Sequence, residues 1–106
     1  MELLPDVEVL FEFSGRRRDN IYEGYRPAHH IKEDYLTTGV HHYYDLSNRS
    51  GEMIKGTIAF ITPEEYPYCL KVGQKILMYE GKELVGEATI IKIFNLLLEK
   101  RSNEYI

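Results

Sequence analysis

The sequence predicts an all-β protein in which about six short strands form a barrel. Three observations indicate this fold: an alternation of apolar and charged residues near the N-terminus, a hairpin pattern near the C-terminus, and short strand-like segments divided by glycine and proline. With 106 residues, 43% of them hydrophobic, the chain is long and apolar enough for one domain with its own core. We expect a single β-barrel domain over residues 1–106, with residues 96–106 as a C-terminal extension.

The first expected strand is Val7–Phe13. Its apolar residues stand at alternate positions, and Glu8 and Glu12 lie on the other face. Because successive side chains of a strand point to opposite faces, this alternation is typical of a strand with one face in the core. The polar stretch that follows, residues 14–20, is expected to form a loop.

The middle of the chain carries three further strand-like segments. Residues 28–36 and 40–46 are expected to be strands that reverse at Thr37-Thr38-Gly39, where the glycine suits a turn. Residues 54–61 predict the next strand, after a turn rich in serine, asparagine and glycine. Residues 62–67 contain two prolines and are expected to form a loop.

The clearest local pattern is a β-hairpin in the last third of the chain. Residues 75–80 and 83–94 supply its strands, and Gly81 offers the positive φ that a tight turn requires. Gly86 interrupts the second strand and indicates a bulge or a close approach of another backbone. Leu96-Leu97-Leu98 is consistent with an edge strand or with one helical turn. The predicted core comprises Val9, Phe11, Ile58, Phe60, Ile76, Met78, Ile90 and Ile93.

An ordered set of short motifs resembles the third domain of elongation factor Tu and its relatives. The hairpin reads Glu-Gly-x-x-x-Val-Gly-x-Ala-x-Ile-x-Lys-Ile over residues 80–93. Upstream, the Gly-Tyr-Arg-Pro at residues 24–27 and the Thr-Gly at residues 38–39 are similar to two motifs of that domain. The Ile-Thr-Pro at residues 61–63 falls where the family has a strand ending in proline. The resemblance covers residues 7–95.

The resemblance implies a six-stranded antiparallel barrel. In the family, this domain touches the T-stem of aminoacyl-tRNA and is a docking surface for protein partners. Thr38 matches the residue that faces the tRNA backbone, and Glu80 and Gly81 match the hairpin tip. Two positions depart from the family, because Tyr79 replaces an arginine and Ala28 replaces a polar residue. Loss of an arginine–phosphate contact removes one charge-assisted anchor, so part of the RNA-contacting set is missing.

The charge of the chain also disfavours RNA as the main ligand. Its formal net charge is −4, whereas proteins that hold nucleic acid through bulk electrostatics usually have a basic pI. The dense basic feature is Arg16, Arg17 and Arg18, which is either a phosphate-contacting loop or a solvated loop that Asp19 partly neutralises. We therefore expect RNA binding to be weak and sensitive to salt.

The four histidines stand as two pairs, His29-His30 and His41-His42. Neighbouring strand residues point to opposite faces, so a pair cannot chelate one metal ion together. With a reversal at Thr38-Gly39, His41 would face about residue 35, and His29 would lie roughly 20 Å along the strand. We predict no metal site, and we expect these histidines to lie on the surface or half-buried.

The sequence shows no catalytic constellation. It has no Gly-x-Ser-x-Gly, no P-loop and no Gly-x-Gly-x-x-Gly. The single cysteine, Cys69, has no recognisable base beside it and is expected to pack in the core. We therefore predict a non-enzymatic protein without a cofactor.

A single cysteine excludes an internal disulfide and suits a reducing cytoplasm. No segment approaches the roughly 18 apolar residues of a membrane span, and the first residues do not resemble a signal peptide. We expect a cytoplasmic protein that does not bind membranes.

The predicted function is the binding of another protein. A barrel that keeps the family's shape without all of its RNA contacts suggests reuse as a protein-interaction module. One version is a bacterial immunity or antitoxin-like protein whose acidic loops at Glu64-Glu65 and Glu80 complement a basic nuclease. The alternatives are a tRNA- or ribosome-associated translation-factor-like module and a small enzyme that uses Cys69 or His41. The candidate binding residues are Arg16, Arg17, Arg18, Thr38, Tyr79, Glu80 and Gly81.

Overall fold

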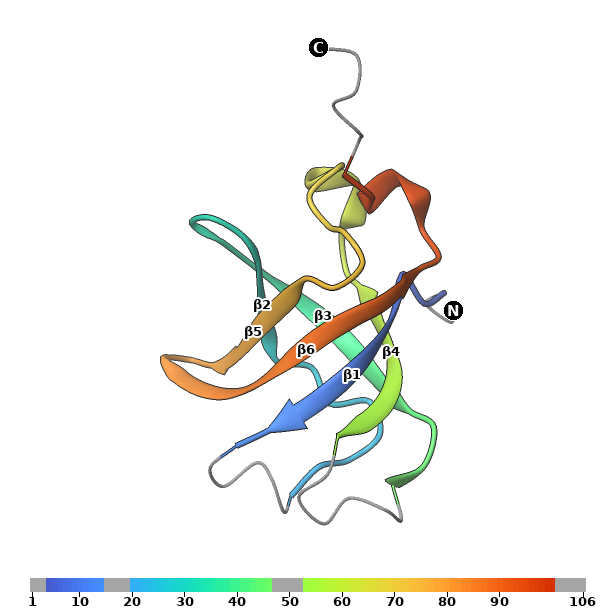
Figure 1. The fold of residues 1–106 in the computed structure, drawn as a ribbon. Coiled ribbons are helices and arrows are strands. Elements are labelled where there is room, and N and C mark those ends of the chain that lie inside the picture. Colours follow the sequence, from blue (N-terminus) through green and yellow to red (C-terminus); the bar gives the residue numbers. More distant parts are fainter. Residues whose placement is uncertain (1–3, 15–19, 47–52, 101–106) are drawn as a thin grey trace.

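The computed structural model describes residues 4–14, 20–46 and 53–100, and within them six strands form a closed barrel. The strands are β1 (Val7–Phe13), β2 (Ala28–Lys32), β3 (Tyr35–Tyr43), β4 (Ile54–Phe60), β5 (Lys75–Glu80) and β6 (Glu83–Ile93). Around the barrel their order is β1-β4-β3-β2-β5-β6, and each neighbouring pair is antiparallel (Figure 1). The predicted all-β class and six-stranded antiparallel barrel are confirmed.

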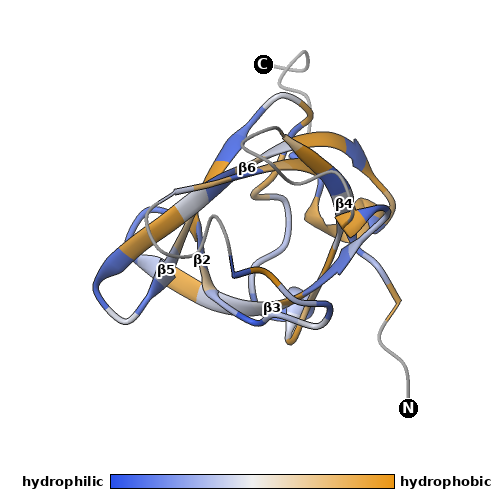
Figure 2. Ribbon diagram, turned by 90° about the horizontal axis from the view of Figure 1, so that it is seen from below, coloured by the Kyte–Doolittle hydropathy of each residue, from blue (hydrophilic) through white to orange (hydrophobic). Residues whose placement is uncertain are grey.

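Alternate side chains of the strands point into the barrel and form its core. In β1 the apolar positions of the predicted alternation are all buried, while Glu8 is half-buried and Glu12 is exposed. All eight residues predicted for the core are buried, and none exposes more than 8% of its surface. Seen from below, the strands form a ring around this core (Figure 2).

The β2–β3 hairpin reverses at a different place from the predicted one. The chain turns at Glu33-Asp34, which places Ala28 opposite Thr38. Asp34 has a left-handed φ of 62°, a conformation that aspartate tolerates better than most residues. The reversal predicted at residues 37–39 is therefore wrong, because residues 35–43 form one continuous strand.

Two glycines of the β5–β6 hairpin have the predicted backbone roles. Gly81 at the turn has a φ of 60°. Gly86 has a φ of 156°, and a Cβ atom on it would lie 2.4 Å from the carbonyl oxygen of Glu12 in β1. A register shift follows, since Met78 pairs with Gly86 whereas Tyr79 pairs with Leu84. The sheet therefore needs a glycine where β1 approaches β6.

Two short helices cover the upper end of the barrel (Figure 1). They are the 3-10 helices η3 (Pro63–Glu65) and η4 (Leu96–Leu98), so residues 96–98 form one helical turn and no edge strand. The segment after η3 joins η4 through a hydrogen bond from the backbone nitrogen of Leu70 to the carbonyl oxygen of Leu98. Tyr66, Leu70 and Leu98 are fully buried beneath this cover.

A buried aspartate, Asp6, ties the ends of three strands together. Its carboxylate accepts hydrogen bonds from the backbone nitrogen of Phe60 at 2.7 Å and from the side-chain amide of Asn95 at 2.8 Å. Its carbonyl oxygen accepts from the backbone nitrogens of Phe94 and Asn95. Burial raises the pKa of the Asp6 carboxyl, although both side-chain hydrogen bonds oppose that shift. Asp6 thus anchors the start of β1 to the ends of β4 and β6.

Candidate functional site

Two histidines form a hydrogen-bonded pair inside the barrel. His29 of β2 and His41 of β3 are 0% and 1% exposed, and their Nε2 atoms lie 2.8 Å apart. The other ring nitrogen of His29 lies 3.2 Å from the carbonyl oxygen of Thr37. The other ring nitrogen of His41 lies 2.7 Å from the hydroxyl of Tyr43. The four groups form one chain of hydrogen bonds through the core.

The direction of every hydrogen bond in this chain follows from the carbonyl group at its end. A carbonyl oxygen only accepts, so Nδ1 of His29 carries a hydrogen, and in the neutral ring Nε2 is then the acceptor. His41 must then donate from Nε2, which leaves its Nδ1 to accept from the Tyr43 hydroxyl. When both rings are neutral, each therefore has a defined tautomer.

The surroundings of the pair favour the neutral form of both rings. Burial lowers the pKa of His29 to about 4, although its hydrogen bonds to backbone oppose that shift. Burial also lowers the pKa of His41 well below its usual value, and His29 contributes in the same direction. The centroid of the Phe11 ring lies 4.4 Å from that of His41, and that of the Phe60 ring lies 5.6 Å from that of His29. The pair is thus an enclosed, uncharged part of the core.

The expectation that all four histidines lie at the surface or half-buried is wrong for two of them. His30 and His42 are exposed, but His29 and His41 are buried. The predicted separation failed because the hairpin reverses earlier, at Glu33-Asp34, and because Gly39 leaves room for the ring of His29. A Cβ atom on Gly39 would lie 2.6 Å from Cγ2 of Ile58 and 2.9 Å from Cε1 of His29. Among residues 4–14, 20–46 and 53–100, no three metal-ligating side chains gather into one group.

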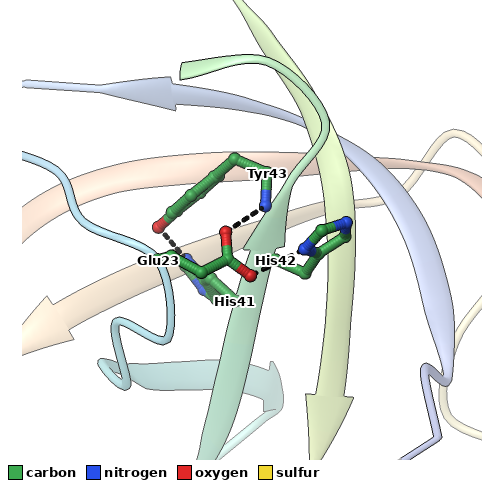
Figure 3. Close-up of polar contacts among 4 residues, drawn as sticks. All are labelled: Glu23, His41, His42 and Tyr43. Atoms are coloured by element: carbon green, nitrogen blue, oxygen red, sulfur yellow. Dashed lines mark hydrogen bonds and ion pairs between the residues drawn. The ribbon is translucent and has the colours of Figure 1, made fainter.

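On the outer side of β3, a carboxylate joins the strand to the segment before β2. Glu23 accepts a hydrogen bond from Nδ1 of His42 at 2.6 Å and another from the backbone nitrogen of Tyr43 at 3.1 Å. Figure 3 shows this carboxylate between the two groups, while the hydroxyl of Tyr43 points toward His41. Both oxygens of Glu23 are therefore engaged at the edge of an outer groove.

This outer groove has a volume of about 740 Å³, within the range of ligand-binding clefts. It crosses the outer faces of β3 and β4 and ends against the residues that flank β1 and β6. Its floor is apolar, with Val40 and Ala59, and Phe94 forms part of its wall. Arg26 also lines it, and its side chain is exposed. We call this feature the outer groove.

A second outer feature, the hairpin patch, lies across β3, β2, β5 and β6. The strand pairs place His30 between Leu36 and Leu77, and they place Tyr79 beside Leu84. Leu36 of β3 and Leu84 of β6, which lie on either side of β2 and β5, are 53% and 47% exposed. A hollow of about 580 Å³ lies between the two hairpin tips, and His30, Leu36 and Tyr79 line it. We define the hairpin patch as His30, Leu36, Leu77, Tyr79 and Leu84.

The structure brings several of the candidate binding residues to this patch. Thr38 and Tyr79 both stand opposite Ala28, one on each side of it. Gly81 lines the hollow at the hairpin tip. Glu80 accepts a hydrogen bond from the hydroxyl of Tyr25, so its carboxylate is engaged within the protein. Arg16, Arg17 and Arg18 lie outside the described residues.

Sequence reasoning missed the histidine pair, the outer groove and the apolar character of the patch. The Glu33-Asp34 dipeptide was the available signal for the first, because a turn there aligns β2 with β3 in the observed register. Leu36 and Leu84 indicate an apolar patch only when it is known that both side chains point outward, and the sequence alone does not show this. The groove had no sequence signal, since residues from five separate segments line it.

Comparison with known proteins found no family model and no curated protein that matches this chain. The resemblance to elongation factor Tu therefore stays a prediction. None of the described helices has the length and apolar character needed to cross a bilayer.

Proposed function

We propose that this protein is a non-enzymatic binding module whose partner is another protein, held at the hairpin patch. The observation that carries the proposal is the exposure of Leu36 on β3 and Leu84 on β6, with Leu77 and Tyr79 on the outer face of β5 between them. Large apolar side chains gathered on one exposed surface are typical of interaction sites. Tyrosine is also among the residue types that dominate binding energy at protein interfaces.

The two residues considered above as possible catalytic groups, Cys69 and His41, lie in settings that support a non-enzymatic role. Cys69 is buried, and burial raises the pKa of its thiol, whereas a reactive cysteine needs an accessible thiolate. His41 is buried and neutral and bonds to two other side chains. Neither group has the accessible setting that a nucleophile or a general base requires.

The rim of the patch supports a partner with basic groups around an apolar centre. Glu33 and Asp34 form one hairpin tip, and Glu83 stands beside Lys82 at the other. Acidic side chains outnumber basic ones at these tips, so a positively charged partner would be attracted to this face. An immunity or antitoxin-like role, in which the protein covers a basic nuclease surface, is the concrete version of the proposal.

The translation-factor-like alternative would use the same face. Thr38 and Tyr79 stand at positions that the resemblance assigns to the tRNA-contacting edge, and they flank Ala28. The acidic tips disfavour phosphate at this surface. The nature of the bound partner therefore separates the two functions.

Site-specific photocrosslinking in the source organism tests the proposal. A photoreactive amino acid at Leu84 is expected to form an adduct with one defined protein, whereas the same amino acid at Lys71, an exposed position outside the patch, is not. Adding Tyr79→Asp should abolish the Leu84 adduct. An adduct that ribonuclease removes would favour the RNA alternative, and equal adducts at both positions would reject the patch as a binding site.

A further inference from the structure

Two outward-facing residues of β4 form the floor of the outer groove. Thr57 and Ala59 are only 7% exposed although they lie on the outer face of the barrel. Val40 of β3 stands beside Ala59, and Phe94 lines the far wall. The small side chain of Ala59 leaves space above the sheet that a larger residue would fill.

A basic side chain lies near each end of this floor. Arg26 lines the groove together with Glu23, and Lys92 stands opposite Glu8, whose carboxylate accepts a hydrogen bond from the hydroxyl of Tyr44. Arg26 lies beside β3, because its neighbour in the sequence, Tyr25, accepts a hydrogen bond through its carbonyl oxygen from the backbone nitrogen of His41 in β3. Among the described residues, the side chain of Arg26 has no hydrogen bond or ion pair, whereas the carboxylate of Glu23 is engaged on both oxygens. At the other end, the ammonium group of Lys92 lies 5.5 Å from the centroid of the Phe94 ring.

The spacing of the strands gives the length of ligand that this groove would hold. From Arg26 the groove crosses β3 and β4 and reaches the chain beside Phe94, which bonds to Asp6 at the start of β1. Three inter-strand spacings amount to about 14 Å, and an extended peptide covers that distance in about four residues. The groove therefore matches a short peptide segment in size.

We propose that the outer groove binds an acidic peptide segment of the partner protein. A carboxylate of the segment pairs with the guanidinium of Arg26, and a neighbouring apolar side chain packs on Val40 and Ala59. Guanidinium and carboxylate groups form paired, charge-assisted hydrogen bonds, which explains the preference for an acidic segment. This inference rests on the proposed protein-binding function, but it uses a different face from the hairpin patch.

Selection from a random peptide library displayed on phage tests the inference. The immobilised protein is expected to enrich peptides in which aspartate or glutamate is next to an aromatic or aliphatic residue. Fluorescence anisotropy then compares one enriched peptide with its amide counterpart, in which asparagine or glutamine replaces the acid. The amide peptide should bind at least about tenfold more weakly. Absence of enrichment, or enrichment of peptides without acidic residues, would overturn the inference.

Variants of the protein locate the bound peptide. Arg26→Gln and the groove-filling Ala59→Phe should each weaken binding about tenfold or more, and Arg26→Lys should be intermediate because it keeps the charge without the planar fork. Lys71→Gln, which removes an exposed cation elsewhere, should have no effect. Equal affinity of Arg26→Gln and the original protein would contradict the inference. Leu84→Glu is expected to leave peptide binding intact, so failure of the groove and failure of the hairpin patch give different results.

Discussion

Acidification should destabilise this protein through the buried histidine pair. Both rings are neutral in the folded barrel, with the pKa of His29 at about 4 and that of His41 well below its usual value. In the unfolded chain each ring takes up a proton near its ordinary pKa of about 6.5. The unfolded state therefore binds more protons as the pH falls below about 6.5, and the free energy of unfolding must decrease.

The size of the effect follows from the shift. One pKa unit corresponds to about 1.4 kcal/mol, so His29 alone accounts for a loss of about 3 kcal/mol between pH 6.5 and pH 4. His41 changes stability in the same direction. Against a typical total of about 5–15 kcal/mol, such a loss is large. The structure also gives the reason why neither ring accepts the charge: an added proton on Nε2 of His29 would face the Nε2–H of His41.

Denaturant unfolding followed by circular dichroism, at about pH 7.5 and about pH 4.5, measures this loss. The double variant His29→Gln/His41→Gln should show a much smaller difference between the two pH values, whatever its stability at pH 7.5. The exposed His30→Gln serves as the control and should keep the original difference. The raised pKa of Asp6 acts in the opposite direction at the acid end, because the folded state then gains the proton first, so the Asp6→Asn background isolates the histidines. Stability that is unchanged down to pH 4.5, or an equal loss in the double variant, would refute the reasoning.

Three further predictions concern the backbone and the ligand. Gly39→Ala should lower the free energy of unfolding by roughly 1–3 kcal/mol, because its Cβ would lie 2.6 Å from Cγ2 of Ile58 and 2.9 Å from Cε1 of His29. In a double-mutant cycle, His29→Ala should relieve only the part of that cost that comes from His29. Gly81→Val should cost roughly 1–3 kcal/mol because of the φ of 60°, whereas Gly81→Asn should cost less; an unchanged melting temperature for the valine variant would count against backbone strain at this turn. Titration with tRNA at about 150 mM salt should show weak binding with a log–log salt slope of roughly −2 to −3; sub-micromolar binding that is lost when residues 16–18 are reversed to glutamate would favour the RNA function.

The fold was predictable because its strongest signals are local. The alternation over Val7–Phe13 and the hairpin over residues 75–94 each need only neighbouring residues and the period of a strand. The β2–β3 hairpin was not predictable in the same way. Its turn is made by Glu33-Asp34, whereas Gly39, which looks like a turn residue, lies inside β3 to make space for a side chain of β2. Glycine marks either a turn or a close approach, and only the pairing of strands distinguishes them.

The candidate binding surfaces depend on longer-range information. The hairpin patch combines outward residues of four strands, and the outer groove combines residues from both ends of the chain. The alternation within one strand shows which of its residues share a face. It does not show which residues of the neighbouring strand lie beside them on that face. Thr38 and Tyr79 were proposed as binding residues from the resemblance, and the register brings them together. Arg26 could be proposed as a binding residue only after the structure showed that it lines the outer groove.

The hydrogen bonds through His29 and His41 constrain the register of β2 and β3 in a way that an entirely apolar core would not. A shift of one residue between β2 and β3 would turn His29 outward and leave His41 inside without its hydrogen-bonding partner. An unpaired polar group in the core costs about 1–3 kcal/mol, so this register is favoured over its neighbours by more than apolar packing alone. The same register places Thr38 opposite Ala28 and Leu36 opposite His30 on the outside. We infer that the neutral histidine pair helps to specify the alignment on which the hairpin patch depends.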